Sequence, residues 1–438
     1  MTYSEAIQFL YDLRWFGTKF GLTNTLKLAA IAGNPQDKLR FIHVAGTNGK
    51  GSTSAMLESI YRAADLRVGL FTSPHLVAFG ERIQVNRKLI VEADILRSVL
   101  EMQPLLKQFA ADEHPTFFEV VTVMALRYFA EQKCDLVIWE TGLGGRLDAT
   151  NIVTPLASVI TNIQYDHQNW LGETLTSIAK EKAGIIKAGI PIVTATDAPE
   201  ALGVIEQMAR GQHAPLTVVS PAEMQSPPLK GIALPLPGQH QRLNAAVAIA
   251  TVRALASQIP ATEETIRTGL ARVQWPGRLQ LVTRSSGQKI LLDGAHNVAG
   301  AEVLAAALKQ SFPSDKFTLV FGILRDKDWT AMCKILAPLA ATILLVPVQS
   351  ERSASPEELG EICRRVNPAA KVQEYPSLSA ALPHAAKDPF VVIAGSLYLI
   401  GEAMELLQLS PAKFEGERGL NEWSGAGQSS QPISPALQ

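Results

Sequence analysis

The stretch that decides the fold is residues 41–53, FIHVAGTNGKGST. Phe41, Ile42 and Val44 favour a short buried strand, and residues 54–62 favour a helix. The glycines of the turn between them let backbone N–H groups face an anion, and the helix N-terminus adds partial positive charge. The stretch therefore predicts a nucleotide phosphate site, with a plain glycine-rich turn of an α/β fold as the alternative.

Lys50 would give this loop a full positive charge, and the hydroxyl of Ser52 or Thr53 would reach Mg²⁺. The spacing differs from the regular GxxxxGK[ST] pattern because Gly51 separates Lys50 from Ser52. The residues expected to bind phosphate are Gly46, Thr47, Asn48, Gly49, Lys50, Gly51, Ser52 and Thr53.

Composition narrows the class of protein. A length of 438 residues favours two or three domains, and 47% hydrophobic with 18% charged residues is typical of a globular chain. A net charge of −1 gives no general attraction to nucleic acid or to an anionic membrane. No secretion signal or long apolar run is recognisable, and the three cysteines are scattered, so we expect a cytoplasmic protein without a membrane partner.

Short apolar segments alternate with helical patterns along most of the chain, which predicts an α/β fold with parallel sheets covered by helices. A break at residues 275–278 precedes a fresh strand at 289–292, and glycine, proline, serine and glutamine dominate from Ser410 onward. We therefore expect domains at 1–279 and 287–409 and a disordered tail at 410–438. The expected strands are 136–139, 157–161, 191–194, 289–292, 318–321, 342–346 and 390–394, and the expected helices include 117–130, 175–186 and 299–310.

Polar clusters follow several of these strands, where open α/β sheets place their ligands. Ser73 could ligate Mg²⁺ or act as a turn serine before Pro74. Glu140 ends an apolar strand, where a buried carboxylate needs a partner; a divalent cation and Arg146 are the two candidates.

The remaining clusters leave similar alternatives. His167 could bind a metal or phosphate oxygen, or be structural, and Lys182 lies in a helix of mixed charge that would ordinarily face solvent. Asp293 and His296 could face one ligand together, or Asp293 could cap the following helix.

Taken in order, these stretches resemble the folylpolyglutamate synthase/dihydrofolate synthase family of the Mur ligase superfamily, from about residue 3 to residue 407. The resemblance implies an N-terminal P-loop NTPase-like Mur ligase central domain and a C-terminal Rossmann-like α/β Mur ligase domain. The motifs that carry it are HVAGTNGKGST, TSPHL with Glu81-Arg82-Ile83, ETGLGGRLDATN, ITNIQYDHQNWLG, IAKEKAGIIK, PGQHQRLNA, WPGRLQ and LLDGAHN.

The resemblance implies an ATP-dependent amide ligase. ATP phosphorylates a folate-type carboxylate, and the α-amine of L-glutamate attacks the acyl phosphate. Lys50 and the loop backbone would hold the phosphates, and Lys182 would be carbamylated to ligate a second Mg²⁺. The other residues with implied roles are Ser73, Glu140 and His167 for Mg²⁺, Asn244, Arg278 and Asp293 for ATP, and His296 beside the reacting phosphate.

The resemblance also implies a pterin site, since two stretches look like those that bind dihydropteroate in bifunctional members. A third, residues 21–25, departs from the type of loop found in such members and weakens the expectation of dihydrofolate synthase activity. The implied substrate-binding residues are Thr116, Phe117, Phe118, Glu119, Leu147, Asp148 and Ala149.

The expected partners are small-molecule substrates: ATP, L-glutamate and a folate or dihydropteroate. The enzyme itself is expected to be a monomer. One alternative is a Mur ligase for a UDP-muramoyl precursor, although Gly46 comes too early to leave room for the additional UDP-binding domain. Another is a P-loop NTPase switch without ligase activity, which would need neither the LLDGAHN cluster nor Arg278.

Overall fold

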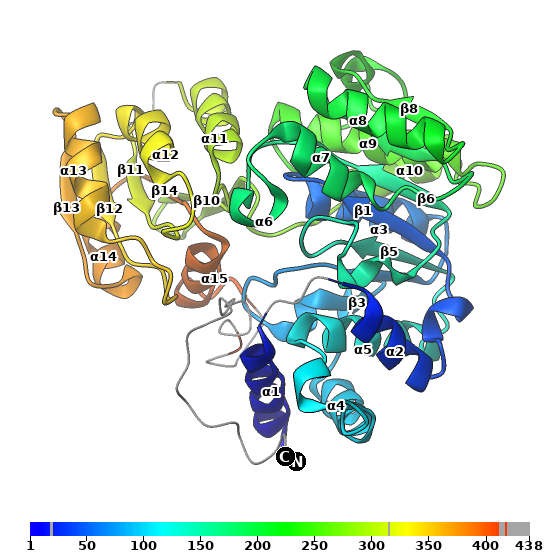
Figure 1. Cartoon of the computed structure of the whole chain (residues 1–438). Helices are drawn as coiled ribbons and strands as arrows, with labels where there is room; N and C mark the ends of the chain where they lie inside the picture. Colours follow the sequence, from blue (N-terminus) through cyan, green and yellow to red (C-terminus); the bar gives the residue numbers. More distant parts are fainter. Residues whose placement is uncertain (18–20, 314–315, 411–416, 418–438) are drawn as a thin grey trace.

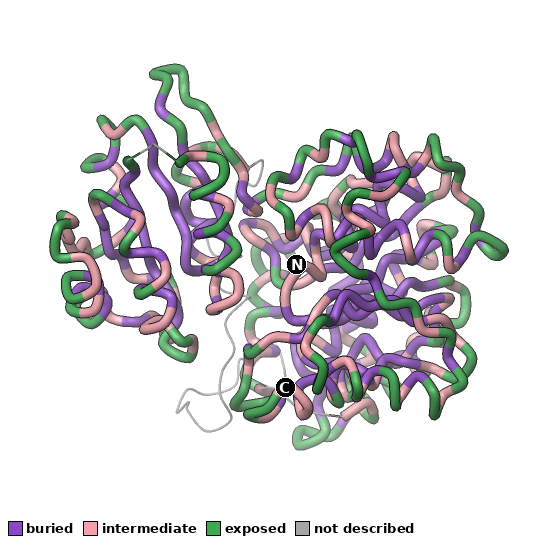
Figure 2. Tube along the Cα trace, turned by 90° about the horizontal axis from the view of Figure 1, so that it is seen from above, coloured by how far each residue is buried: buried purple, intermediate pink, exposed green. Residues whose placement is uncertain are grey.

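The computed structural model describes residues 1–17, 21–313, 316–410 and 417, and it folds into two lobes (Figure 1). Each lobe has a mostly parallel sheet with helices on both faces, which confirms the expected α/β class. Buried backbone runs through the centre of each lobe and exposed backbone follows its rim (Figure 2). None of the helices in the described part of the chain is long and apolar enough to cross a membrane.

The N-terminal lobe is built on an eight-stranded sheet. Its strands are parallel except at one edge, where β3 and β4 run antiparallel to their neighbours. In spatial order the strands are β4 (Lys88–Leu89), β3 (Ile83–Val85), β2 (Val68–Phe71), β5 (Leu136–Glu140), β1 (Phe41–Ala45), β6 (Ala157–Ile160), β7 (Ile192–Thr194) and β8 (Leu216–Val218).

Strand β1 shows why this sheet is covered on both faces. Phe41 packs into a hydrophobic cluster on one face, and Ile42 and Val44 pack into the cluster on the other, as the two-residue period of a strand requires. The first cluster contains α1 (Tyr3–Asp12), α2 (Thr23–Ile31), α4 (Glu92–Leu106) and α5 (Phe117–Glu131), and the second contains α3 (Lys50–Ala63), α9 (Gln239–Ala254) and α10 (Glu263–Ala271). The remaining helices of the lobe are α6 (Gln168–Leu171), α7 (Leu175–Ala183) and α8 (Pro199–Gly211).

The C-terminal lobe has a six-stranded sheet in which only β9 is antiparallel to its neighbour. Its strands, in spatial order, are β13 (Lys371–Glu374), β12 (Thr342–Leu345), β11 (Thr318–Phe321), β14 (Phe390–Ala394), β10 (Lys289–Asp293) and β9 (Gln280–Thr283). Its helices are α11 (Val298–Ser311), α12 (Trp329–Leu336), α13 (Pro356–Val366), α14 (Leu378–Ala385) and α15 (Leu397–Leu406).

The expected strands and helices are present with small differences at their ends. Helix α7 ends at Ala183, short of the expected residue 186. Strand β9 lies in the interval left between the two expected domains, and pairs with β10 of the second sheet. The division at 1–279 and 287–409 stays a prediction.

The expected disordered tail falls mostly on residues 411–416 and 418–438, which lie outside the described residues. Glu417 is described and buried, and its carboxylate accepts hydrogen bonds from the Phe79 N–H and the Tyr3 hydroxyl.

Candidate active site between the two lobes

A cavity of about 760 Å³ lies between the lobes, and the carboxyl ends of strands from both sheets open into it. The N-terminal lobe contributes the turns after β1, β2, β5 and β6, and the C-terminal lobe those after β10, β11, β12 and β14. All of the residues with expected roles line this cavity except Thr53, which is fully buried on α3. Ser52 lines the cavity, so of the two hydroxyls expected near Mg²⁺ it is the one the cavity exposes, and the role of Thr53 stays a prediction.

The glycine-rich loop has the backbone that an anion site needs. Gly49 has a left-handed φ of +84° and forms the N-cap of α3, which starts at Lys50. Gly46 has a φ of +147°, and a Cβ there would lie 1.9 Å from the hydroxyl oxygen of Thr161. The loop thus combines glycine-only backbone with the N-terminus of a 14-residue helix, which favours anion binding.

The unusual Gly51 has a tertiary explanation. The ring of Trp275 packs over it, and a Cβ at residue 51 would lie 2.7 Å from Cζ2 of that ring. Trp275 also lines the cavity, and the Arg87 guanidinium lies over its ring at 5.6 Å from the ring centre. Glycine is required here by the close approach of a residue 224 positions later in the chain, and not by its own φ.

Two lysines converge on this loop. The Lys50 ammonium donates to the carbonyl oxygens of Gly46 (3.0 Å) and Thr47 (3.2 Å), and the Lys182 ammonium donates to the same Gly46 oxygen (2.8 Å). Burial, and after it the charge of Lys50, lowers the pKa of Lys182 to about 7. Lys182 is buried at 4% exposure, so the alternative of a solvent-facing lysine is wrong.

Glu140 is a buried carboxylate at the end of β5. Its carboxylate accepts the backbone N–H of Ser73 at 3.3 Å. Burial raises the pKa of Glu140 to about 7, although the charge of Lys50 opposes the shift. Arg146 pairs with Glu181 at 2.8 Å, so the suggested Glu140–Arg146 salt bridge is wrong.

The turn after β10 also settles an alternative. Asn297, and not Asp293, caps α11 by accepting the Gly300 N–H. Asp293 accepts the backbone N–H groups of Leu279 and Ala295, both within 2.9 Å, and thereby ties the turn to Leu279, which directly follows the break at residues 275–278. Burial raises the pKa of Asp293, against the influence of Arg278.

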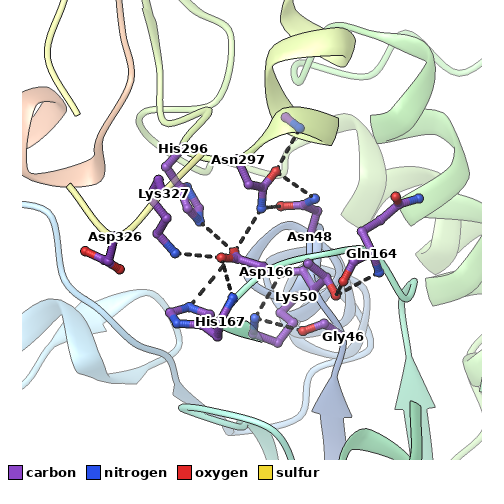
Figure 3. A network of polar contacts seen from close by, with 12 residues as sticks. Gly46, Asn48, Lys50, Gln164, Asp166, His167, His296, Asn297, Asp326 and Lys327 are labelled. Carbon is purple, nitrogen blue, oxygen red and sulfur yellow. Dashed lines mark hydrogen bonds and ion pairs between the residues drawn. The ribbon is translucent and has the colours of Figure 1, made fainter. Parts of the chain in front are cut away.

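Asp166 is the meeting point of the two lobes (Figure 3). Its carboxylate receives the Lys327 ammonium at 2.6 Å and the Asn297 amide at 3.0 Å, both from the C-terminal lobe, and His296 Nε2 lies 3.7 Å away. Burial alone would raise the pKa of Asp166, but the charge and hydrogen bond of Lys327 act together with the neighbouring His167 and His296 and hold the pKa well below its usual range. Burial lowers the pKa of His296 to about 4, so this imidazole is neutral near pH 7.

Another part of the cavity lining, at the start of α5, carries two aromatic rings, Phe117 and Phe118. Phe118 packs against Gly142, and the Arg82 guanidinium lies 5.4 Å from the ring centre of Phe117. Thr116 and Glu119 form a reciprocal cap at the start of α5, and the Thr25 hydroxyl donates to Glu119 at 3.2 Å. Residues 21–25 thus adjoin this wall even though they depart from the pattern of bifunctional members.

The loop that carries Asp148 forms the neighbouring wall. The Asp148 carboxylate accepts hydrogen bonds from the backbone of Leu143 and from both the backbone and hydroxyl of Thr150. Leu147, Asp148 and Ala149 therefore present one fixed surface to the cavity.

Asn244 and Arg278 are the other two residues that the resemblance assigns to ATP. Asn244 on α9 lies against Gly49, because a Cβ at Gly49 would lie 2.5 Å from the side-chain oxygen of Asn244. Only the family resemblance had assigned a role to Asn244. The half-buried Arg278 guanidinium lies beside Gly294, and desolvation lowers its pKa. Both residues line the cavity, Asn244 beside Gly49 of the glycine-rich loop and Arg278 beside Gly294 of the turn after β10.

Sequence reasoning missed the connection between the lobes. Asp166 and Asn297 lie inside quoted motifs without an assigned role, and Lys327 was not singled out. The signal that identified the other clusters also exists at Lys327, since a charged run, residues 325–328, follows the buried strand β11. The partner of Lys327 lies 161 positions away, and no local pattern names it.

Comparison with known proteins identifies the class first. Residues 44–252 match the family model of the Mur ligase middle domain, and residues 277–397 match that of the Mur ligase, glutamate ligase domain. The fold and the two-lobed site are therefore those of a Mur ligase.

Similarity over the whole length narrows the class. The dihydrofolate synthase/folylpolyglutamate synthase of Bacillus subtilis is 38% identical over 93% of this chain and 99% of its own, and the folylpolyglutamate synthase of Lacticaseibacillus casei is 36% identical over 93% and 99%. The crystal structure of Thermotoga maritima folylpolyglutamate synthase superposes with a TM-score of 0.82, at 33% identity over 95% of this chain and 98% of that one. Escherichia coli FolC, solved in complex with DHPP and ADP, gives a TM-score of 0.82 at 32% identity over 93% and 98%.

The chain belongs to the folylpolyglutamate synthase/dihydrofolate synthase family. The expected family is confirmed, and these relatives give no support to a UDP-muramoyl ligase or a non-ligase switch.

Proposed function

We propose that this chain is an ATP-dependent ligase that joins L-glutamate to folates, with dihydropteroate as a second acceptor. A carboxylate oxygen of the acceptor attacks the γ-phosphorus of ATP, and ADP leaves. The α-amine of glutamate then attacks the acyl phosphate carbon, the amide bond forms, and phosphate departs with the electron pair of the broken C–O bond while the amine loses a proton.

One observation carries this proposal: a single cavity joins the phosphate loop, the aromatic wall and the C-terminal turn with His296. Phosphoryl transfer depends mainly on positioning and on neutralising charge, and Lys50 supplies a cation at the helix start. Both lobes line the cavity, so their approach would exclude water from the acyl phosphate.

Mg²⁺ fits the residues that the resemblance implies. Glu140 is a buried carboxylate whose hydrogen bond from the Ser73 N–H is long, at 3.3 Å, an arrangement that a cation would relieve, and Ser73 and His167 line the same cavity. Mg²⁺ would neutralise charge on the transferred phosphoryl group. Among the described residues no group of three or more His, Cys, Asp and Glu side chains could hold a metal, so the ligand set would need Ser73 and a modified Lys182.

Carbamylation of Lys182 has a physical basis in its environment. The reaction needs a neutral amine, whose nitrogen attacks the carbon of CO₂ and releases a proton. A pKa near 7 leaves a large neutral fraction at physiological pH, where an ordinary lysine has almost none. A mass increase at Lys182 in bicarbonate, absent after Lys182→Ala, would support this modification.

The decisive assay combines purified protein with ATP, Mg²⁺ and glutamate, and offers tetrahydrofolate or dihydropteroate in turn. We expect ADP release that depends on both glutamate and acceptor, with a glutamylated product detected by mass spectrometry. ATP hydrolysis that ignores both substrates would contradict ligase activity. Product with tetrahydrofolate alone would contradict the proposed dihydrofolate synthase activity.

We expect the enzyme to act in the cytoplasm as a monomer, without nucleic acid or membrane partners, because the charge is near neutral and one chain supplies the whole cavity. Size-exclusion chromatography with light scattering would test the monomer.

A further inference from the structure

The structure carries a network of polar contacts that the proposed reaction does not yet use. The network joins the phosphate loop and Asp166 of the N-terminal lobe to Asn297 and Lys327 of the C-terminal lobe (Figure 3). We propose that Asp166 is a positioning residue that locks the two lobes together and thereby aligns the C-terminal turn on the phosphate loop. This interlobe lock goes beyond the proposed function, and its structural test does not depend on which substrate the enzyme uses.

On the N-terminal side, the segment that carries Asp166 is tied to the phosphate loop. The Asn162 backbone oxygen accepts the Thr47 N–H at 3.0 Å, and its side-chain oxygen accepts the Asn48 N–H at 2.8 Å. The Gln164 N–H donates to the Thr47 hydroxyl at 3.0 Å. Any shift of the phosphate loop is therefore transmitted to residues 162–166.

On the C-terminal side, the two groups held by Asp166 belong to different turns. Lys327 follows β11, and its ammonium is 2.6 Å from Oδ1. Asn297 caps α11 and donates to Oδ2 at 3.0 Å, so one carboxylate fixes two strand-end turns of the same sheet. Charge-assisted hydrogen bonds of this length are the stronger kind.

Asn297 closes the network on the phosphate loop itself. Its side-chain amide exchanges hydrogen bonds with the Asn48 amide, at 3.0 and 3.3 Å. Both hydrogen bonds span the two lobes, so a change in the separation of the lobes would stretch or break them. These contacts therefore couple the position of the phosphate loop, residues 46–53, to the position of the C-terminal lobe.

Burial makes the lock costly to break. Asp166 and Lys327 both have side chains less than a tenth exposed, with 6% and 8% of the side-chain surface accessible. Removing one partner leaves the other as a buried, unpaired charge, which opens the interface or draws water into it. Because a misplacement of about 1 Å can reduce catalysis by about 100-fold, loss of alignment should reduce kcat.

The test measures the distance between the two lobes. Spin labels at Lys180→Cys on α7 and Glu358→Cys on α13, both exposed positions, report the interlobe distance in the full-length protein by pulsed electron resonance. We expect Asp166→Asn to lengthen or broaden the distance distribution and to lower kcat by about 10- to 100-fold, with a smaller change in the KM for ATP. Lys327→Met should do the same, and the double variant should be within about twofold of the worse single variant because both break one contact.

Asp326→Asn is the matched control. Asp326 precedes Lys327 on the same turn, and its carboxylate faces Arg352 of its own lobe at 3.5 Å. Its distance distribution should match that of the unsubstituted protein. An unchanged distribution in folded Asp166→Asn, or additive losses of kcat in the double variant, would overturn the lock. Failure of folate-dependent turnover in the unsubstituted enzyme would instead reject the proposed function and leave the distance result intact.

Discussion

At the scale of single residues, the phosphate loop shows a local motif shaped by a distant neighbour. Gly51 is the residue that breaks the regular spacing, and Trp275 is the side chain that fills the space above it. A methyl group there would force the ring, and the segment 275–278 that carries it, to move.

We expect Gly51→Ala to destabilise the fold by about 1–3 kcal/mol, as overpacking does, and to weaken ATP binding. Thermal unfolding and calorimetric titration with ATP would measure the two effects. Gly203→Ala on α8 is the control, because no atom lies within 4 Å of its added Cβ. Addition of Trp275→Ala should recover part of the lost stability; no recovery would contradict the steric explanation.

Glu140 supports a second prediction at this scale. Replacing it with alanine removes the buried carboxylate proposed to face Mg²⁺, so the Mg²⁺ concentration for half-maximal activity should rise sharply. Glu140→Gln, which keeps the shape and loses the charge, should behave similarly. A Mg²⁺ dependence equal to that of the unsubstituted enzyme would reject the metal assignment.

At the scale of elements, the start of α5 combines a helix cap with the wall of the cavity. Thr116 accepts the Glu119 N–H, and the Glu119 carboxylate accepts the Thr116 N–H at 2.8 Å. This reciprocal capping box satisfies two donors that a helix end leaves without a partner. The same two side chains line the cavity, so the cap also fixes the proposed pterin wall.

Thr116→Ala should therefore lower the free energy of unfolding by about 1 kcal/mol and raise the KM for folate. Thr262→Ala is the control at another helix, since Thr262 caps the exposed start of α10 by accepting the Thr265 N–H at 3.2 Å. It should cost comparable stability and leave the KM for folate unchanged. Equal effects of both variants on that KM would show that the cap acts only through overall stability.

At the scale of the whole molecule, buried histidines connect stability to pH. His43 lies inside β1, accepts or donates one bond with the Thr150 hydroxyl, and is fully buried. Burial, followed by the charge of Lys187, lowers the pKa of His43 to about 3. The unfolded chain, with a histidine pKa of about 6.5, binds the proton more readily than the folded chain does.

The free energy of unfolding should therefore fall as pH decreases from 6.5 toward 3, by at most about 1.4 kcal/mol per pH unit for this histidine. Denaturant melts at pH 7.5, 5.5 and 4.5 would measure the slope. His43→Gln should reduce the slope, and His213→Gln, at an exposed position, should leave it unchanged. A slope unaffected by His43→Gln would contradict the assignment.

The sequence by itself determined the α/β class, the phosphate loop and the strand-end polar clusters. These features can be recognised locally: strand formers such as Phe41 and Ile42, a glycine turn and a helix start lie within 13 consecutive residues. The family resemblance added roles to the same positions.

Only the tertiary structure decided which polar groups meet. Arg146 pairs with Glu181 and not with Glu140, and Asp166 pairs with Lys327 across the two lobes. The Trp275 ring likewise packs over Gly51 from a distant part of the chain. Each of these contacts depends on the order of strands in a sheet or on the approach of two sheets. Local periodicity carries no information about that order, so the chain had to be folded before the interlobe contact could be recognised.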